Sequence, residues 1–172
     1  MRARSHHKFM AQDLIDVLIR QWKTERPDLN VEPMGVVGRV LRLATRLERR
    51  VSETLKPYGL TVGGFDILAT LRRTGNPQGL TPTELMEAVM LSSGAMTNRI
   101  DRLEEQGLVE RRPSPNDRRS LQVLLTAEGR KVVDKAVADR LDEAEGALCG
   151  LKAEERDQLA DLLRAMLQGL ND

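Results

Sequence analysis

Residues 80–129 decide the fold of this chain, and they read LTPTELMEAVMLSSGAMTNRIDRLEEQGLVERRPSPNDRRSLQVLLTAEG. The segment opens on the motif TPTE, which is typical of a helix start. Thr81 is a good helix cap, Pro82 suits the first helical position, and Glu84 closes a capping box. These residues therefore predict a short helix that ends near Val89.

A second helix is predicted over residues 92–106. Ser92 or Ser93 caps this helix, and Gly107 ends it. Its apolar residues recur at three- and four-residue steps, which defines one buried face. That inward stripe consists of Met96, Ile100 and Leu103. Two short helices separated by only two residues predict a helix-turn-helix.

After the second helix, the apolar periodicity changes from the 3.6 residues of a helix to the two residues of a strand. Residues 108–112 and 121–125 are the predicted strands. The sequence PSPNDRR, residues 113–119, lies between them as a basic tip stiffened by proline. A β-hairpin that directly follows a helix-turn-helix is a wing, so the segment predicts a winged helix-turn-helix.

The second helix has the side chains that a DNA recognition helix needs. Small polar residues near its N-terminus let the backbone approach the major groove and let hydroxyl and amide groups reach base edges. The wing tip adds arginines, which suit the narrow minor groove and its negative potential. The predicted DNA-contacting residues are Ser92, Ser93, Thr97, Asn98, Arg102, Arg118 and Arg119.

The rest of the chain is predicted to be helical, which gives a mainly α fold with a small β-wing. Helices are expected at about 10–24, 34–57, 62–74, 126–148 and 153–169. Three regions follow from this pattern. They are an N-terminal extension with an amphipathic helix (1–32), a helical dimerisation region (33–58 with 126–172) and a winged helix-turn-helix DNA-binding domain (59–125).

Composition restricts the function further. The net charge is +1, but residues 1–138 carry +6 and residues 139–172 carry −5, which favours a polyanion partner for the basic part. No apolar run approaches the roughly 20 residues of a membrane span, and the N-terminus lacks a secretory signal. The one cysteine, Cys149, excludes an internal disulfide. We therefore expect a cytoplasmic protein with no membrane partner.

Catalysis is not expected. The two histidines, His6 and His7, are adjacent at the N-terminus, and no Ser-His-Asp, Cys-His or metal-spaced cluster is present. The sequence therefore predicts no catalytic residues, no metal site and no cofactor. It assigns no role to Cys149 or to the two histidines.

The same residues resemble the MarR family of transcriptional regulators. The resemblance lies in LTPTEL (80–85), SSGAMTNRIDRL (92–103), GLV (107–109) and DRR (117–119) followed by LTAEG (125–129), and it extends over residues 34–170. It implies a homodimer joined by helices from both chain ends, repression, and release from DNA by a small ligand. Two recognition helices in one dimer predict a pseudo-palindromic operator on double-stranded DNA.

The N-terminal extension is similar to that of the PecS-like, urate-responsive branch, because a Trp-bearing helix is followed by ERPDL (25–29). The resemblance implies an effector site formed by Trp22, Asp66, Arg99 and Arg111. One departure is GGFD at residues 63–66, where the branch often has GEFD. The chemistry suits urate, a planar purine anion, because guanidiniums match its charge, an indole stacks on it and a carboxylate accepts its ring N–H.

Two alternatives remain open from the sequence. In the first alternative, the chain is a repressor of the same type whose effector is another aromatic or phenolic anion. In the second, the chain is an architectural protein that binds DNA with little sequence preference. Footprinting separates the second from a repressor, since only a repressor protects a defined palindrome. The operator sequence, the regulated genes and any role in activation do not follow from the sequence.

Overall fold

The computed structural model describes residues 12–89, 93–113 and 121–171. Ser92, Arg118, Arg119 and the His6-His7 pair, all singled out above, lie outside the described residues. The chain divides into two compact units, residues 1–49 and 50–172. No helix in the described ranges combines the length and apolar character that a membrane span requires.

The first unit contains α1 (Leu14–Glu25) and the N-terminal part of α2 (Met34–Leu55). The sequence predicted that the first helix starts at residue 10, and this boundary is wrong because Asp13 caps the helix. The Asp13 carboxylate accepts hydrogen bonds from the backbone N–H groups of Ile15 and Asp16, at 2.8 and 3.1 Å. Asp16 completes a capping box, and Arg39 of α2 binds Asp13 at 3.0 Å and Asp16 at 2.7 Å.

The second unit begins with the end of α2, which runs into a short 3-10 turn, η1 (Lys56–Tyr58). Gly59 then adopts φ +66°, as expected for a left-handed helix terminator. The unit also contains two long helices, α6 (Ala127–Ala147) and α7 (Ala153–Asn171). Arg50 of α2 binds Glu143 of α6 at 2.6 Å, and the Tyr58 hydroxyl donates to Asp139 at 2.5 Å.

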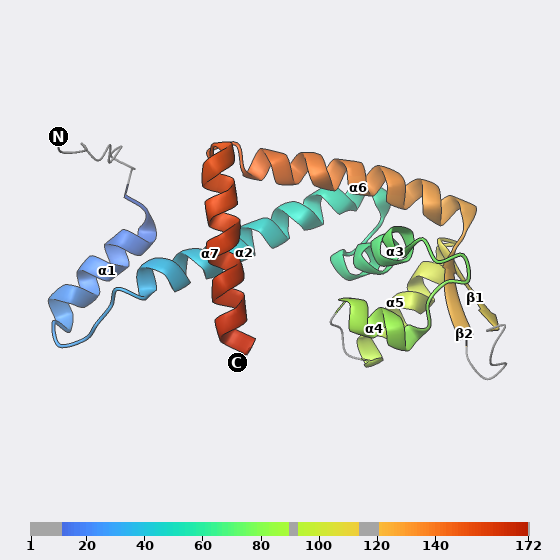
Figure 1. The fold of residues 1–172 in the computed structure, drawn as a ribbon, viewed down its shortest axis with the longest axis horizontal. Coiled ribbons are helices and arrows are strands. Elements are labelled where there is room, and N and C mark those ends of the chain that lie inside the picture. The colour runs from blue at the N-terminus through green and yellow to red at the C-terminus, as the bar shows by residue number, and fades with distance from the viewer. Residues whose placement is uncertain (1–11, 90–92, 114–120, 172) are drawn as a thin grey trace. The chain divides into compact units, whose positions relative to one another are not determined.

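The winged helix-turn-helix lies in the same unit, as Figure 1 shows. It is formed by α3 (Val62–Thr74), α4 (Pro82–Val89), α5 (Ser93–Glu105), β1 (Val109–Pro113) and β2 (Leu121–Leu125). The two strands pair antiparallel, with Val109 opposite Leu125. Leu80 adds a further bridge to Val123, with N–O distances of 2.8 and 3.1 Å.

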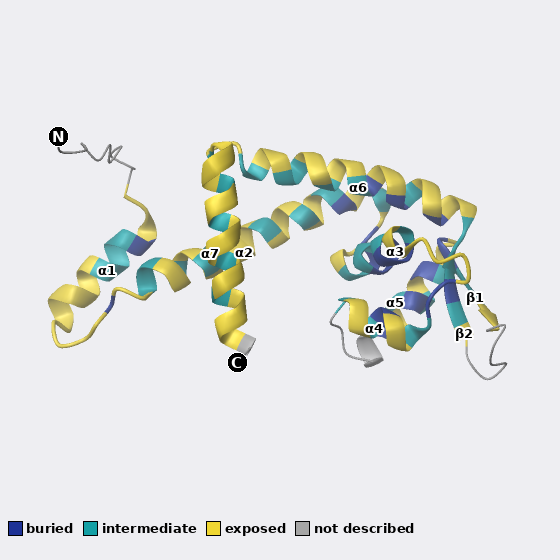
Figure 2. Ribbon diagram, viewed as in Figure 1, coloured by how far each residue is buried: buried dark blue, intermediate teal, exposed yellow. Residues whose placement is uncertain are grey.

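These elements enclose the apolar core of the second unit (Figure 2). The predicted stripe of α5 is confirmed, since Met96, Ile100 and Leu103 are all buried. For α3 the apolar spacing of the sequence predicts an inward face of Phe65, Leu68, Ala69 and Leu71. Leu68 and Leu71 are buried, but Phe65 and Ala69 are only partly buried, and the other buried side chains of this helix are those of Ile67 and Thr70.

Candidate DNA interface and effector site

The face of α5 that points away from the core carries the predicted DNA contacts. Thr97, Asn98 and Arg102 are exposed there, on the side opposite Met96 and Ile100. Ser93 is the first residue of α5, but its side chain is outside the described part of the chain, as are Ser92, Arg118 and Arg119. The described part of the interface is thus a helix face of small and basic polar groups, which matches a recognition helix.

The helix before it starts as the sequence predicted. The Thr81 hydroxyl accepts from the backbone N–H of Glu84 at 3.2 Å, and the Glu84 carboxylate accepts from the backbone N–H of Thr81 at 2.7 Å. These bonds form the predicted capping box and hold the pKa of Glu84 below its usual value. The N-terminus of α4 is therefore fixed, and α5 packs against this helix.

Arg111 joins the wing to α5. Its Nη2 lies 2.5 Å from the Asp101 carboxylate, its Nη1 forms an ion pair with Glu104, and its backbone N–H donates to Glu104 at 3.1 Å. Burial lowers the pKa of Arg111, but these carboxylates outweigh it and raise the pKa above its ordinary value. Sequence reasoning missed Asp101 and Glu104 as partners of Arg111. The sequence feature that could have identified these partners is their spacing of three residues on a helix that directly precedes a basic strand.

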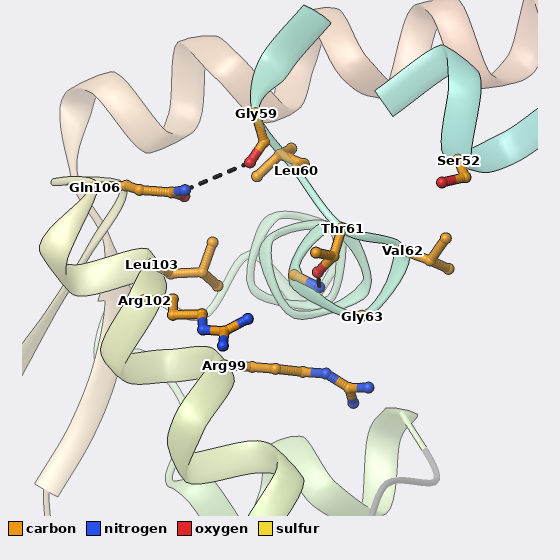
Figure 3. Close-up of a pocket in the computed structure, with 11 residues that line it drawn as sticks. Ser52, Gly59, Leu60, Thr61, Val62, Gly63, Arg99, Arg102, Leu103 and Gln106 are labelled. Carbon is orange, nitrogen blue, oxygen red and sulfur yellow. Dashed lines mark hydrogen bonds between the residues drawn. The ribbon is translucent and has the colours of Figure 1, made fainter. Parts of the chain in front are cut away.

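A cleft of about 510 Å³ lies between α5, the end of α2 and the start of α3 (Figure 3). Arg99, Arg102, Leu103 and Gln106 line it from α5, so it shares Arg102 with the predicted DNA contacts. Its opposite wall is formed by Ser52, Gly59, Leu60, Thr61, Val62, Gly63 and Gly64. A ligand in the cleft can therefore contact α3 and α5 at once.

Arg99 and Arg102 are the basic residues that line this cleft, and neither is in an ion pair within the described ranges. The Nη1 of Arg99 is buried and has no hydrogen-bond partner among the described residues. Half-buried Asp66, on α3, also makes no hydrogen bond or ion pair within the described ranges. Burial raises the pKa of Asp66, while the positive charges of Arg99 and Arg140 oppose that rise.

Arg99 thus acts on the charge of Asp66, whereas Arg111 is paired with two carboxylates of α5. At 100° per residue, the partners of Arg111, Asp101 and Glu104, lie roughly 140° to 200° around α5 from Arg99. Trp22 lies on α1, in the other unit, with 45% of its surface exposed, and its place in the site stays a prediction.

Sequence reasoning did not connect Arg140 with Asp66, whose pKa its charge affects. Arg140 lies on α6, more than 70 residues from Asp66, so no local motif connects the two. The available signal was its charge, because Arg140 is a cation in a stretch that also contains Asp139, Asp142 and Glu143. In the described part of the chain, no group of three or more His, Cys, Asp or Glu residues is placed to hold a metal ion.

A helix-turn-helix with an exposed polar recognition helix and an attached β-wing defines a winged-helix DNA-binding protein. A model described as the MarR family matches residues 60–121. The HTH-type transcriptional regulator PecS of Dickeya dadantii is 38% identical over 146 residues, which are 85% of this chain and 88% of that protein. The chain therefore belongs to the MarR family, and it is a DNA-binding transcriptional regulator and not an enzyme.

Two solved structures are similar over most of their length. A mutant of MarR from Escherichia coli in complex with operator DNA has a TM-score of 0.68 at 28% identity, covering 91% of this chain and 99% of that one. BpsR of Bordetella bronchiseptica, whose DNA binding is regulated by 6-hydroxynicotinic acid, has a TM-score of 0.67 at 27% identity, covering 76% and 91%.

Proposed function

We propose that this chain is a homodimeric repressor that binds a pseudo-palindromic operator and is released by a small anion, urate or a related purine. The observation that carries the proposal is the cleft between α5 and the start of α3, which Arg99 lines. The buried, unpartnered Nη1 of Arg99 is a donor that an anionic ligand satisfies.

Exposed apolar side chains on the long helices support the homodimer. Monomeric proteins rarely expose large contiguous apolar patches, so such side chains favour an interface. They include Val36, Val37, Leu41 and Leu43 of α2, Leu141 of α6, and Leu162, Leu167 and Leu170 of α7. Two recognition helices in one dimer enter successive major grooves, which gives half-sites about 10 base pairs apart.

Effector release follows from the position of Arg99. A ligand shifts an equilibrium only through unequal affinity for two states, and Arg99 belongs to the helix that reads DNA. An anion held by Arg99, with its ring N–H donated to Asp66, favours one position of α5 over another. The expected loss of DNA affinity is about 5- to 150-fold. Trp22 and Arg111 are the further members of the site that the sequence predicts.

A gel-shift titration with footprinting tests the proposal. We expect one protected palindrome, a dimer by light scattering at micromolar concentration, and release of the operator by urate. Arg118→Ala should weaken binding to every sequence and lower the salt slope, while Asn98→Ala should relax sequence preference. Operator binding that ignores millimolar urate would contradict the effector assignment.

The second candidate effector is another aromatic or phenolic anion. This candidate is supported by the similar structure of BpsR, whose DNA binding is regulated by 6-hydroxynicotinic acid. The guanidinium of Arg99 and the carboxylate of Asp66 suit any planar ring with an acidic oxygen and an N–H or O–H. A panel of such anions in the same titration separates it from urate. Uniform coating in the footprint would instead indicate an architectural DNA-binding protein.

A further inference from the structure

A further basic cleft, of about 280 Å³, lies in the first unit beside the N-terminus of α1. Arginines of α2 form most of its lining, with one leucine of the same helix and the residue that caps α1. The lining residues are Arg39, Arg42, Leu43, Arg46 and Asp13. All of them lie within residues 1–49, so the cleft belongs to one compact unit. Three arginines and one aspartate give the lining a charge of +2, which favours an anion.

The spacing of the three arginines explains why they meet. Arg39, Arg42 and Arg46 follow the steps i, i+3 and i+7, which place side chains on the same face of a helix. At 100° per residue, all three fall within about 60° around α2. A basic row of this kind on a helix is usually only a solvated face. Here it differs, because α1 encloses it and one of its guanidiniums is partly buried.

Arg39 fixes α1 against this face of α2 and forms a preset wall of the cleft. Its Nε donates to Asp13 at 3.0 Å, its Nη2 donates to Asp16 at 2.7 Å, and its Nη1 donates to a backbone carbonyl one turn earlier at 2.8 Å. Ile15 packs on α2 at Gly38, where an added Cβ would lie 3.1 Å from the Ile15 Cδ1. The guanidinium of Arg39 is therefore already satisfied by the protein.

Arg42 and Arg46 have no such partners. Neither forms an ion pair within the described ranges, and the Nη1 of Arg42 is buried without a hydrogen-bond partner among those residues. A buried charged donor without an acceptor destabilises the fold. Asp13, the carboxylate of the cleft, already accepts from Arg39 and from the first turn of α1. An anion in the cleft would supply the acceptor that Arg42 lacks.

We propose that this cleft binds a small oxyanion with the chemistry of phosphate, held between Arg42 and Arg46, with Arg39 as a positioning residue. Planar guanidiniums bind phosphate oxygens through paired N–H donors, and two arginines four residues apart reach the same anion. The site shares no residue with the cleft that Arg99 lines, so it goes beyond the proposed function. A bound anion stabilises the first unit, since it binds only the folded form.

Calorimetry of the full-length protein with inorganic phosphate, at constant ionic strength, tests the inference. Arg42→Gln and Arg46→Gln should each weaken phosphate binding about 10-fold or more, because a hydrogen bond to a charged group is lost. Arg42→Lys should lose less, since it keeps the charge without the planar fork. Arg49→Gln is the matched control, because it removes an exposed arginine of the same helix outside the cleft and should leave the affinity unchanged.

Melting curves give a second measurement. Trp22 is the one tryptophan of the chain and lies on α1, so its fluorescence follows the first unit. Without phosphate, Arg42→Gln should melt at or above the wild-type temperature, because it removes a buried donor that has no partner. Phosphate should raise the melting temperature of the wild type more than that of the variant. If Arg42→Gln unfolds α1, the exposed Arg46→Gln carries the test.

Three outcomes would overturn the inference. The first is a wild-type protein that does not bind millimolar phosphate, and the second is equal phosphate affinity in the wild type, Arg42→Gln and Arg46→Gln. The third is a dimer that the double variant of Arg42 and Arg46 dissociates in the absence of phosphate, because these guanidiniums would then bind carboxylates of a second copy. None of the measurements contains urate or operator DNA, so they stand or fall independently of the proposed function.

Discussion

The guanidinium of Arg99 lies directly against the backbone of Gly63. A Cβ built at residue 63 would lie 2.5 Å from both Nε and Cζ of Arg99, closer than such atoms approach in proteins. Arg99 therefore crosses the first turn of α3 only because residue 63 has no side chain (Figure 3). The glycine therefore controls where the guanidinium of Arg99 points in the cleft that both residues line.

Gly63→Ala should displace Arg99 and weaken effector binding at least 10-fold without unfolding the protein. The displaced atoms are the end of a flexible side chain, and alanine is favoured over glycine in helices by up to about 1 kcal/mol. Thermal melting should thus change little, while urate calorimetry shows the loss. Gly169→Ala in α7 is the matched control, because a Cβ at that position would meet no atom within 4 Å. Equal urate affinity in the Gly63 variant and the wild type would contradict the positioning role.

Gly129→Ala should destabilise the fold by about 3 kcal/mol, at the upper end of what overpacking usually costs. A Cβ at residue 129 would lie 1.8 Å from the carbonyl oxygen of Leu108, which is backbone and cannot rotate away. The start of α6 would have to move from the strand that it covers. Urea unfolding measures the change. Gly150→Ala, with open space around its Cβ, should unfold at the wild-type midpoint.

Most of the fold could be predicted because its signals are local. The capping box of Thr81 and Glu84 and the left-handed residue Gly107, at φ +71°, each follow from a few neighbouring residues and their backbone preferences. The predicted start of α1 was wrong although its signal is equally local. Asp13 and Asp16 have the spacing of a capping box, and that pair, more than the apolar periodicity, sets where the helix begins.

The site was harder to predict because its residues meet only through packing. Asp66 and Arg99 were identified from family motifs, whereas Arg140, whose charge opposes the rise in the pKa of Asp66, lies on a helix more than 70 residues away. Arg111 illustrates the same limit, because its charge was visible in the sequence and its partners on α5 were not. Partner choice between charged side chains depends on tertiary geometry, which periodicity does not specify.

Asp66→Asn should raise the melting temperature at pH 7, with an advantage that shrinks as the pH falls. Burial raises the pKa of Asp66 in the folded state, so the folded protein binds this proton more tightly than the unfolded chain does. That stability is present below the unfolded pKa and is lost as the pH rises through the folded pKa. At neutral pH the ionised carboxylate is therefore a cost, which asparagine removes.

Melting curves from pH 7 to pH 4 measure the effect of Asp66→Asn. The exposed Asp142→Asn on α6 is the control, and it should follow the wild type across the range. A melting temperature below the wild type at pH 7 would indicate that Arg99 and Arg140 stabilise the carboxylate more than burial penalises it. The same variant should weaken urate binding, since the neutral amide oxygen of asparagine is a weaker acceptor of the ring N–H than a carboxylate.

Arg111→Gln should weaken operator binding in the absence of any effector, because it releases the wing from the recognition helix. The substitution removes the ion pairs with Asp101 and Glu104. Both carboxylates are more than a third exposed, so the expected loss of stability is only about 1 kcal/mol, or about 3 °C in melting temperature. Gel shifts of the ligand-free protein should show the larger effect, since a mispositioned wing contacts DNA poorly.

Urate calorimetry on the same Arg111→Gln variant decides which arginine forms the effector site. If the effector is held by Arg99 without Arg111, urate affinity should stay within about twofold of the wild type, because the cluster around Arg111 has a net negative charge and repels the anion. Arg99→Gln provides the reference for a residue that contacts the ligand. A loss as large as that of Arg99→Gln would instead place Arg111 in the site, as the family resemblance implies, and would require the ligand to free it from Asp101 and Glu104.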